Sequence, residues 1–156
     1  MILIADSSAL IALAVIDKLE ILDRLFGNVY IPRAVYNEII KEHKESSIKL
    51  QSYAQDRVLD ISSNINFNVS LGLGESEAII LYKEQNADYL LCDDKKAKKF
   101  AKSFGINVVG SLGVLLRAKE EGYIKQLTPS IDRLRDSTIY IDEKTYHLVL
   151  KLADEI

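Results

Sequence analysis

Cysteine, histidine, proline and glycine are all scarce in this chain of 156 residues, and each scarcity excludes a class of protein. The single cysteine excludes an internal disulfide framework and a zinc site built from cysteines. The two histidines, His43 and His147, are too few and too far apart for a histidine-rich metal centre or an HExxH motif. Two prolines and seven glycines exclude collagen-like and low-complexity sequences.

Long apolar runs and an excess of basic charge are also missing. No apolar run approaches the roughly 18–20 residues of a membrane span, and the apolar stretch at 8–16 lacks the basic start and cleavage site of a signal peptide. We therefore expect a cytoplasmic protein with no membrane partner. The net charge of −3 excludes a histone-like nucleic-acid binder. A composition of 48% hydrophobic and 28% charged residues is typical of one globular domain, spanning residues 1–156.

Short apolar runs alternate with helical stretches along the chain. The run at 2–5 is continuous, as in a strand buried on both faces. Further strands are expected at 29–31, 58–61, 89–92 and 106–109. Helices are expected at 9–13, 19–26, 32–44, 48–55, 75–85, 95–104 and 111–121, and from 128 and 142. This alternation predicts an α/β domain with a mostly parallel sheet, in which ligands bind beyond the carboxyl ends of the strands.

A few residues are expected to set the ends of these elements. Pro32 suits the first position of its helix, and Ser111 and Asp142 are expected as N-caps. The asparagine-rich segment 62–70 is expected to be a loop, and 139–141 is expected to be extended.

Acidic side chains follow two of the expected strands. Asp6 comes after the first, and Asp93-Asp94 after the strand at 89–92. Glu38 lies about two turns into the helix that follows Pro32, and Glu75 opens the helix after a Gly-Leu-Gly turn. If the two strands are neighbours, about 5 Å apart, their carboxylates can meet and repel one another. A hard divalent cation such as Mg²⁺ or Mn²⁺ would relieve this repulsion.

Each acid also has a structural role open to it. Glu75 can favour a helix N-terminus through the macrodipole, and Glu38 can be a solvated helix residue. For Asp94, the N-cap of the lysine-rich helix is favoured over metal binding. The joint placement of the acids favours a metal site more than any of them does alone.

Four stretches carry a family resemblance: D-S-S-A-L-I at 6–11, V-Y-I-P-x-x-V-x-x-E at 29–38, G-E-S-E-A-I at 74–79 and L-L-C-D-D at 90–94. Together they resemble the motifs of PIN-domain proteins, the fold of the VapC-type toxin ribonucleases, and in particular a small prokaryotic PIN-like group. The resemblance covers the chain to about Lys119 and is weaker in the helical tail, 122–156. It implies a three-layer α/β/α sandwich with a mostly parallel central sheet.

By position, the resemblance assigns a cluster of catalytic, metal-binding acids: Asp6, Glu38, Glu75 and Asp93. Asp94 is a further candidate ligand, and Ser8 is a polar group expected to steady Asp6 or a metal-bound water. The implied cofactor is one or two Mg²⁺ or Mn²⁺ ions, which lower the pKa of a bound water and polarise the scissile phosphate of an RNA substrate.

Two positions depart from the family pattern. Glu75 stands where typical members have Asp, and Gly110-Ser111 occupies a place where some PIN nucleases have a further acid. The longer side chain moves a ligand oxygen by roughly one C–C bond length. Both departures bear on the number of metal ions and the strength of catalysis rather than on the fold.

Five lysines cluster between residues 95 and 102, on the helix that begins at the proposed site. Lys95, Lys96 and Lys99 are the candidate contacts to an RNA backbone, and a solvated helix face is the alternative. No dinucleotide fingerprint or GxxxxGK[ST] motif is present.

The leading hypothesis is therefore a metal-dependent endoribonuclease, and the resemblance implies the toxin of a type II toxin–antitoxin pair. A cognate antitoxin protein and a second copy of the chain are the partners that it implies. One alternative is a catalytically weak or inactive PIN-like module that binds RNA or protein. The other is a structure-specific DNA nuclease. The apolar residues 114–116 are either core or a dimer surface.

Overall fold

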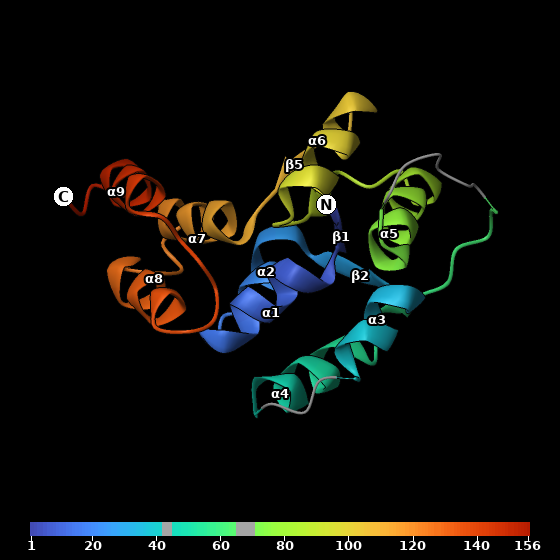
Figure 1. Ribbon diagram of the computed structural model, residues 1–156, viewed down its shortest axis with the longest axis horizontal. Coiled ribbons are helices and arrows are strands. Elements are labelled where there is room, and N and C mark those ends of the chain that lie inside the picture. Colours follow the sequence, from blue (N-terminus) through green and yellow to red (C-terminus); the bar gives the residue numbers. More distant parts are fainter. Residues whose placement is uncertain (42–44, 65–70) are drawn as a thin grey trace.

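Five parallel strands form the central sheet in the described part of the chain, residues 1–41, 45–64 and 71–156 of the computed structural model (Figure 1). Along the sheet the order is β3-β2-β1-β4-β5. The strands are β1 (Ile2–Ala5), β2 (Asn28–Pro32), β3 (Val58–Leu59), β4 (Tyr89–Leu91) and β5 (Val108–Val109). The predicted α/β class with a parallel sheet is confirmed.

Helices connect the strands and cover both faces of the sheet (Figure 1). They are α1 (Ser7–Val15), α2 (Glu20–Phe26), α3 (Arg33–Ile39), α4 (Glu45–Ala54), α5 (Leu73–Glu84), α6 (Lys95–Ser103), α7 (Ser111–Glu120), α8 (Thr128–Arg135) and α9 (Glu143–Leu152). None of the helices in the described part of the chain combines the length and apolar character needed to cross a bilayer.

Successive residues of β1 enter two different cores, because side chains alternate across a strand. Leu3 and Ala5 pack in the larger core, to which α1, α2 and α7 contribute. Ile4 packs in the second core, with α5 and α6. The sheet is therefore buried on both faces, and the three-layer α/β/α arrangement expected from the sequence is confirmed.

The C-terminal helices α7, α8 and α9 lie together at one side of the molecule (Figure 1). Val114 and Leu115 of α7 are fully buried in the larger core, and Leu116 packs against it. Of the two roles open to this segment, the structure therefore places it in the core.

Two helix starts differ from the prediction. Pro32 is the last residue of β2 and the N-cap of α3, because its extended ψ of 149° continues the strand. Ser111 is the first residue of α7 and Gly110 is the N-cap, because the Ser111 side chain is engaged elsewhere. The helix expected at 32–44 ends at Ile39.

Parts of some predicted segments lie outside the described residues: 42–44, including His43, and 65–70 of the expected loop. Residues 62–64 and 139–141 belong to no helix or strand. Asp142 caps α9 as expected, accepting a 2.6 Å hydrogen bond from Thr145 N.

The order in which the chain adds strands to the parallel sheet reverses at β1. From β1 the chain goes outward through β2 and β3, and it then returns to β4 and β5 on the other side. β1 and β4 are hydrogen-bonded neighbours, with Ala5 opposite Leu91, and Asp6 N donates to Leu91 O over 2.9 Å. Open α/β sheets bind ligands at such a switch point, beyond the carboxyl ends of the strands.

Candidate active site

Asp6 is the acid at the switch point, and it is only 3% exposed. It occupies the N-cap of α1, yet its side chain makes no capping hydrogen bond. Its Oδ2 lies 3.7 Å from the Sγ atom of Cys92. Cys92 is buried, as predicted for a core residue. Burial raises the pKa of Asp6 to about 6, and the charges of Glu75 and Glu38 add to this, against a hydrogen bond from the Ser7 backbone.

Glu38 and Glu75 approach Asp6 from α3 and α5. Ser7 Oγ donates to Glu38 Oε2 over 2.8 Å. Gly74 lets the two helices come close, because a Cβ at that position would lie 2.5 Å from Glu38 Oε1. The structure therefore brings together three of the four predicted acids. Glu38 and Glu75 lie close enough to Asp6 for their charges to raise its pKa.

Glu75 also takes the structural role that the sequence left open. Its Oε2 accepts a 2.6 Å hydrogen bond from Gly72 N, which is half of a capping box at the start of α5. The neighbouring Glu77 accepts a 3.0 Å bond from Ala34 N at the start of α3. The acidic motif therefore also fixes two helix N-termini next to Asp6.

Asp93 follows β4 and is held by the first residue of α7. Its Oδ1 accepts from Ser111 N over 2.8 Å, and its Oδ2 accepts from Ser111 Oγ over 2.7 Å. Gly110 leaves room for two side chains, because a Cβ there would lie 2.9 Å from both Asp93 Oδ1 and Lys98 Nζ. Ser111 therefore orients the carboxylate at the place where the sequence lacks a further acid.

Asp94 and Ser8 are the two further candidates near the acids, and only the Asp94 side chain has a hydrogen-bond partner among the described residues. Asp94 caps α6, with Oδ2 accepting from Ala97 N over 2.8 Å, as the favoured alternative had it. Ser8 Oγ is buried and makes no hydrogen bond with the described residues. The serine that contacts a predicted acid in this turn is Ser7.

The donors at this edge suit a hard divalent cation in their chemistry. They are carboxylates, and burial and neighbouring negative charge raise the pKa of the central one. Within 1–41, 45–64 and 71–156, no three Asp, Glu, His or Cys side chains already converge as a metal-binding group. Binding of a cation would therefore require the carboxylates to adjust, starting with the hydrogen bond of Glu75 to Gly72.

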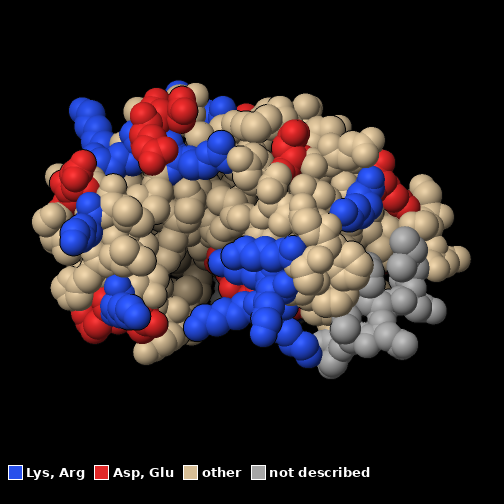
Figure 2. Space-filling view, turned by 90° about the horizontal axis from the view of Figure 1, so that it is seen from above, with Lys and Arg blue, Asp and Glu red and all other residues tan. Residues whose placement is uncertain are grey.

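Basic side chains gather beside the acids. Figure 2 shows Lys and Arg side chains grouped on this face, with acidic atoms visible beneath them, at the edge of a hollow. Lys95 and Lys98 of α6 line a cavity together with Asp93 and Ser111. Lys96 and Lys99, the other predicted RNA contacts, are exposed on the same helix.

Two residues at this edge were not predicted as site residues, Ser111 and Tyr140, and Lys98 was predicted only as a member of the lysine cluster at 95–102. Tyr140 lines the same cavity and is 87% exposed. A signal for it was available, because side chains alternate along an extended segment. Ile139 and Ile141 both pack against the larger core, which leaves Tyr140 pointing outward.

The parallel sheet and the acids beyond β1 and β4 define the class of protein, an α/β domain of the PIN type. The chain belongs to the PIN-domain family DUF3368, whose model matches residues 2–155. PIN domains are commonly nucleases that use divalent metal ions.

A solved structure resembles the chain over most of its length. It is a PilT N-terminus domain protein, SSO1118, from the hyperthermophilic archaeon Sulfolobus solfataricus P2. It is 26% identical and superimposes with a TM-score of 0.57, covering 76% of this chain and 93% of its own. A search of curated proteins finds no match.

Proposed function

We propose that the protein is a metal-dependent endoribonuclease that hydrolyses phosphodiester bonds of RNA. The observation that carries the proposal is the position of Asp6. It is a buried carboxylate at the switch point of the sheet, and the charges of Glu38 and Glu75 raise its pKa further. A buried acid whose pKa is raised by burial and by acidic neighbours is typical of a functional site, because such sites are where perturbed pKa values cluster.

In this proposal, the predicted acids hold one or two Mg²⁺ or Mn²⁺ ions. Asp6, Glu38 and Glu75 provide oxygen ligands from three elements, and Asp93 completes the set. When bound, the cation supplies an activated water and offsets negative charge at the scissile phosphate. The hydrogen bonds of Ser7 to Glu38 and of Ser111 to Asp93 orient two of these carboxylates.

The lysines of α6 provide the attraction for the RNA backbone. Lys95 and Lys98 line the cavity beside Asp93, and Lys96 and Lys99 extend the basic surface along α6. This local charge offsets the net charge of −3, which a bound divalent cation reduces further.

The proposal is tested with purified full-length chain, labelled single-stranded RNA and added Mg²⁺ or Mn²⁺. We expect cation-dependent cleavage that Asp6→Asn and Asp93→Asn each abolish. The matched control is Asp136→Asn, an exposed acid at the end of α8, which should cleave like wild type. Cleavage that survives both site substitutions contradicts the proposal, and preferential cleavage of DNA of the same sequence identifies a DNA nuclease instead.

The biological role proposed from the family resemblance is that of a toxin, with an antitoxin protein and a second copy of the chain as partners. Expression of the chain should then arrest growth, and Asp6→Asn should abolish the arrest. Co-expression of a small protein encoded in the adjacent reading frame should restore growth. Growth arrest that persists in Asp6→Asn contradicts a toxin that acts through RNA cleavage.

One alternative has its own support: a PIN-like module that binds without cleaving. Glu75 is engaged by Gly72 N, and both Asp93 oxygens are engaged by Ser111. A thermal-shift titration separates the two functions, because a cation that binds the folded state stabilises it by mass action. A cation-dependent rise in Tm that Asp6→Asn removes supports the nuclease, and no specific rise supports the module.

A further inference from the structure

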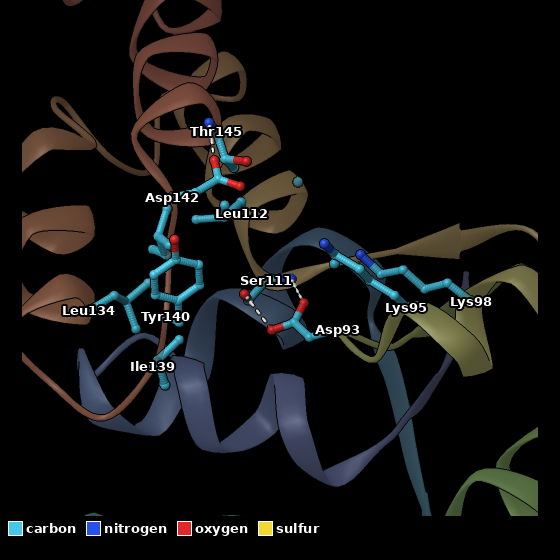
Figure 3. Close-up of a pocket in the computed structure, with 13 residues that line it drawn as sticks. Asp93, Lys95, Lys98, Ser111, Leu112, Leu134, Ile139, Tyr140, Asp142 and Thr145 are labelled. Atoms are coloured by element: carbon cyan, nitrogen blue, oxygen red, sulfur yellow. Dashed lines mark hydrogen bonds between the residues drawn. The ribbon is translucent and has the colours of Figure 1, made fainter. Parts of the chain in front are cut away.

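A cavity of about 340 Å³ lies next to Asp93, and the metal chemistry proposed above does not use most of it. The first turns of α6 and α7 form one side, and the segment between α8 and α9 forms the other (Figure 3). Its volume lies within the range of small-molecule sites, about 300–1,000 Å³.

The two sides of the cavity differ in chemistry. Lys95 and Lys98 project from α6 on one side, above the hydrogen-bonded pair of Asp93 and Ser111 (Figure 3). The opposite side is apolar and aromatic, formed by Leu134, Ile139, Tyr140 and Ile141, and Leu112 of α7 contributes a further apolar side chain. A ligand that fills this space needs a flat apolar part and an anionic part a short distance away.

Two of the polar groups that line the cavity already have hydrogen-bond partners. Hydrogen bonds from Thr145 lower the pKa of Asp142 at the start of α9, and the charge of Lys95 across the cavity adds to this. The Asp142 carboxylate is thus engaged in capping its helix, and Asp93 is engaged by Ser111. The two lysines are the groups in the cavity that suit an anion.

Tyr140 presents its aromatic ring to solvent at the edge of the cavity. Its side chain is 87% exposed, while the isoleucines on either side of it pack against the core. An exposed aromatic ring across a cavity from a lysine pair suits single-stranded nucleic acid, because proteins bind it by stacking an aromatic ring on a base and attracting the phosphate with basic side chains.

We propose that this cavity is a nucleotide subsite, in which one base of single-stranded RNA stacks on Tyr140 and the adjacent phosphate lies between Lys95 and Lys98. The subsite rests on the proposed function, since it would present the next phosphodiester to Asp93. A base inside a duplex is already stacked and paired, so the subsite selects single strands.

Binding can be measured without cleavage, by fluorescence anisotropy of the full chain in EDTA. The labelled ligand is a single-stranded oligoribonucleotide of about ten nucleotides, within the range of known single-strand sites. Tyr140→Ala is expected to weaken binding about 10-fold, and Tyr140→Phe to bind like wild type, because base stacking needs the ring and not the hydroxyl. The control is Leu152→Ala, which removes an exposed apolar side chain from α9.

An abasic oligonucleotide of the same length tests whether Tyr140 contacts a base. Wild type and Tyr140→Ala should bind it equally, because the interaction requires both partners. The variant Lys95→Gln/Lys98→Gln should reduce the slope of log affinity against log salt by about 0.7 for each phosphate contact, and Lys151→Gln should leave it unchanged. The duplex form of the RNA should compete poorly.

The outcomes separate the subsite from the nuclease. If Tyr140→Ala binds the RNA like wild type, or loses as much affinity for the abasic strand, the subsite is wrong, even where Asp6-dependent cleavage is seen. If binding depends on Tyr140 and on the base while no cation supports cleavage, the subsite stands and the nuclease fails. Melting temperatures measured alongside check that the variants are folded.

Discussion

Ser111 holds Asp93 through two hydrogen bonds, one from its backbone N–H at 2.8 Å and one from its hydroxyl at 2.7 Å. The pairing links the end of β4 to the first residue of α7, 18 positions later in the chain. It fixes the direction of the carboxylate before any cation binds. Ser111 therefore acts on the proposed metal site as a positioning residue.

Removing the Ser111 hydroxyl should weaken cation binding. Ser111→Ala keeps the backbone bond to Oδ1 but frees Oδ2, so that the carboxylate loses part of its orientation. We expect Mn²⁺ affinity to fall about 10-fold, the lower end of what outer-shell substitutions cost. Isothermal titration measures this, with Ser103→Ala as control, because the Ser103 hydroxyl donates to Phe100 O within its own helix, away from the acids. Unchanged affinity would show that Asp93 is positioned without the hydroxyl.

Asp6 should make the metal-free protein less stable as pH rises. Its pKa is raised from 3.8 to about 6, so its contribution to stability is fully present below pH 3.8 and is lost as pH rises through about 6. The full loss is about 3 kcal/mol at most. Asp6→Asn should remove this part of the pH dependence and be more stable than wild type at pH 7.5, as measured by urea unfolding in EDTA. An identical pH profile in the variant contradicts this.

Cation affinity should change with pH in the opposite direction. A carboxylate must lose its proton to bind a metal, and Asp6 is mostly protonated below its pKa of about 6. We expect apparent Mn²⁺ affinity to be about 10-fold lower at pH 5 than at pH 7.5. Titrations at both pH values, with Glu38→Gln for comparison, measure the effect. If the cation displaces a proton from the Asp6 carboxyl group, the pH dependence of the affinity should persist in Glu38→Gln.

Much of the fold could be predicted because its strands are continuous apolar runs and its helices have clear ends. The apolar run at 2–5 forms β1, as predicted. The acids that follow β1 and β4 lie at the same edge of the sheet, because these two strands are parallel neighbours. The predicted helix positions of Pro32 and Ser111 are each wrong by one residue, for a similar reason. Both residues favour helix starts locally, but the strand continues through Pro32 and a distant carboxylate engages Ser111.

The cavity could not be predicted, since it depends on contacts between distant segments. Tyr140 and Lys98 are 42 positions apart and line one cavity because α8 and α9 lie beside α7. No local pattern encodes that packing. The alternation of Ile139 and Ile141 around Tyr140 shows which side chain faces outward, but not what lies opposite.

Glu155 should be the residue that holds this C-terminal part in place. Its carboxylate is 8% exposed and accepts from Leu127 N, Thr128 N, Thr128 Oγ1 and Lys119 Nζ, over 2.5–2.9 Å. Burial works against ionisation, but these hydrogen bonds lower the pKa to about 2. The contribution to stability is therefore present above pH 4.5 and is lost as pH falls through about 2.

Glu155→Ala should lower the free energy of unfolding by about 3 kcal/mol at pH 7, because it leaves Leu127 N and Thr128 N at the start of α8 without their acceptor and leaves the Lys119 ammonium with Ala153 O alone of these two acceptors. Urea unfolding at pH 7 measures the loss, and Glu120→Ala, an exposed acid at the end of α7, should change stability by less than about 0.5 kcal/mol. Since α8 and α9 carry the Tyr140 side of the cavity, hydrogen exchange should also become faster at 137–142. A variant as stable as wild type, with unchanged exchange there, would show that hydrophobic packing alone holds these helices.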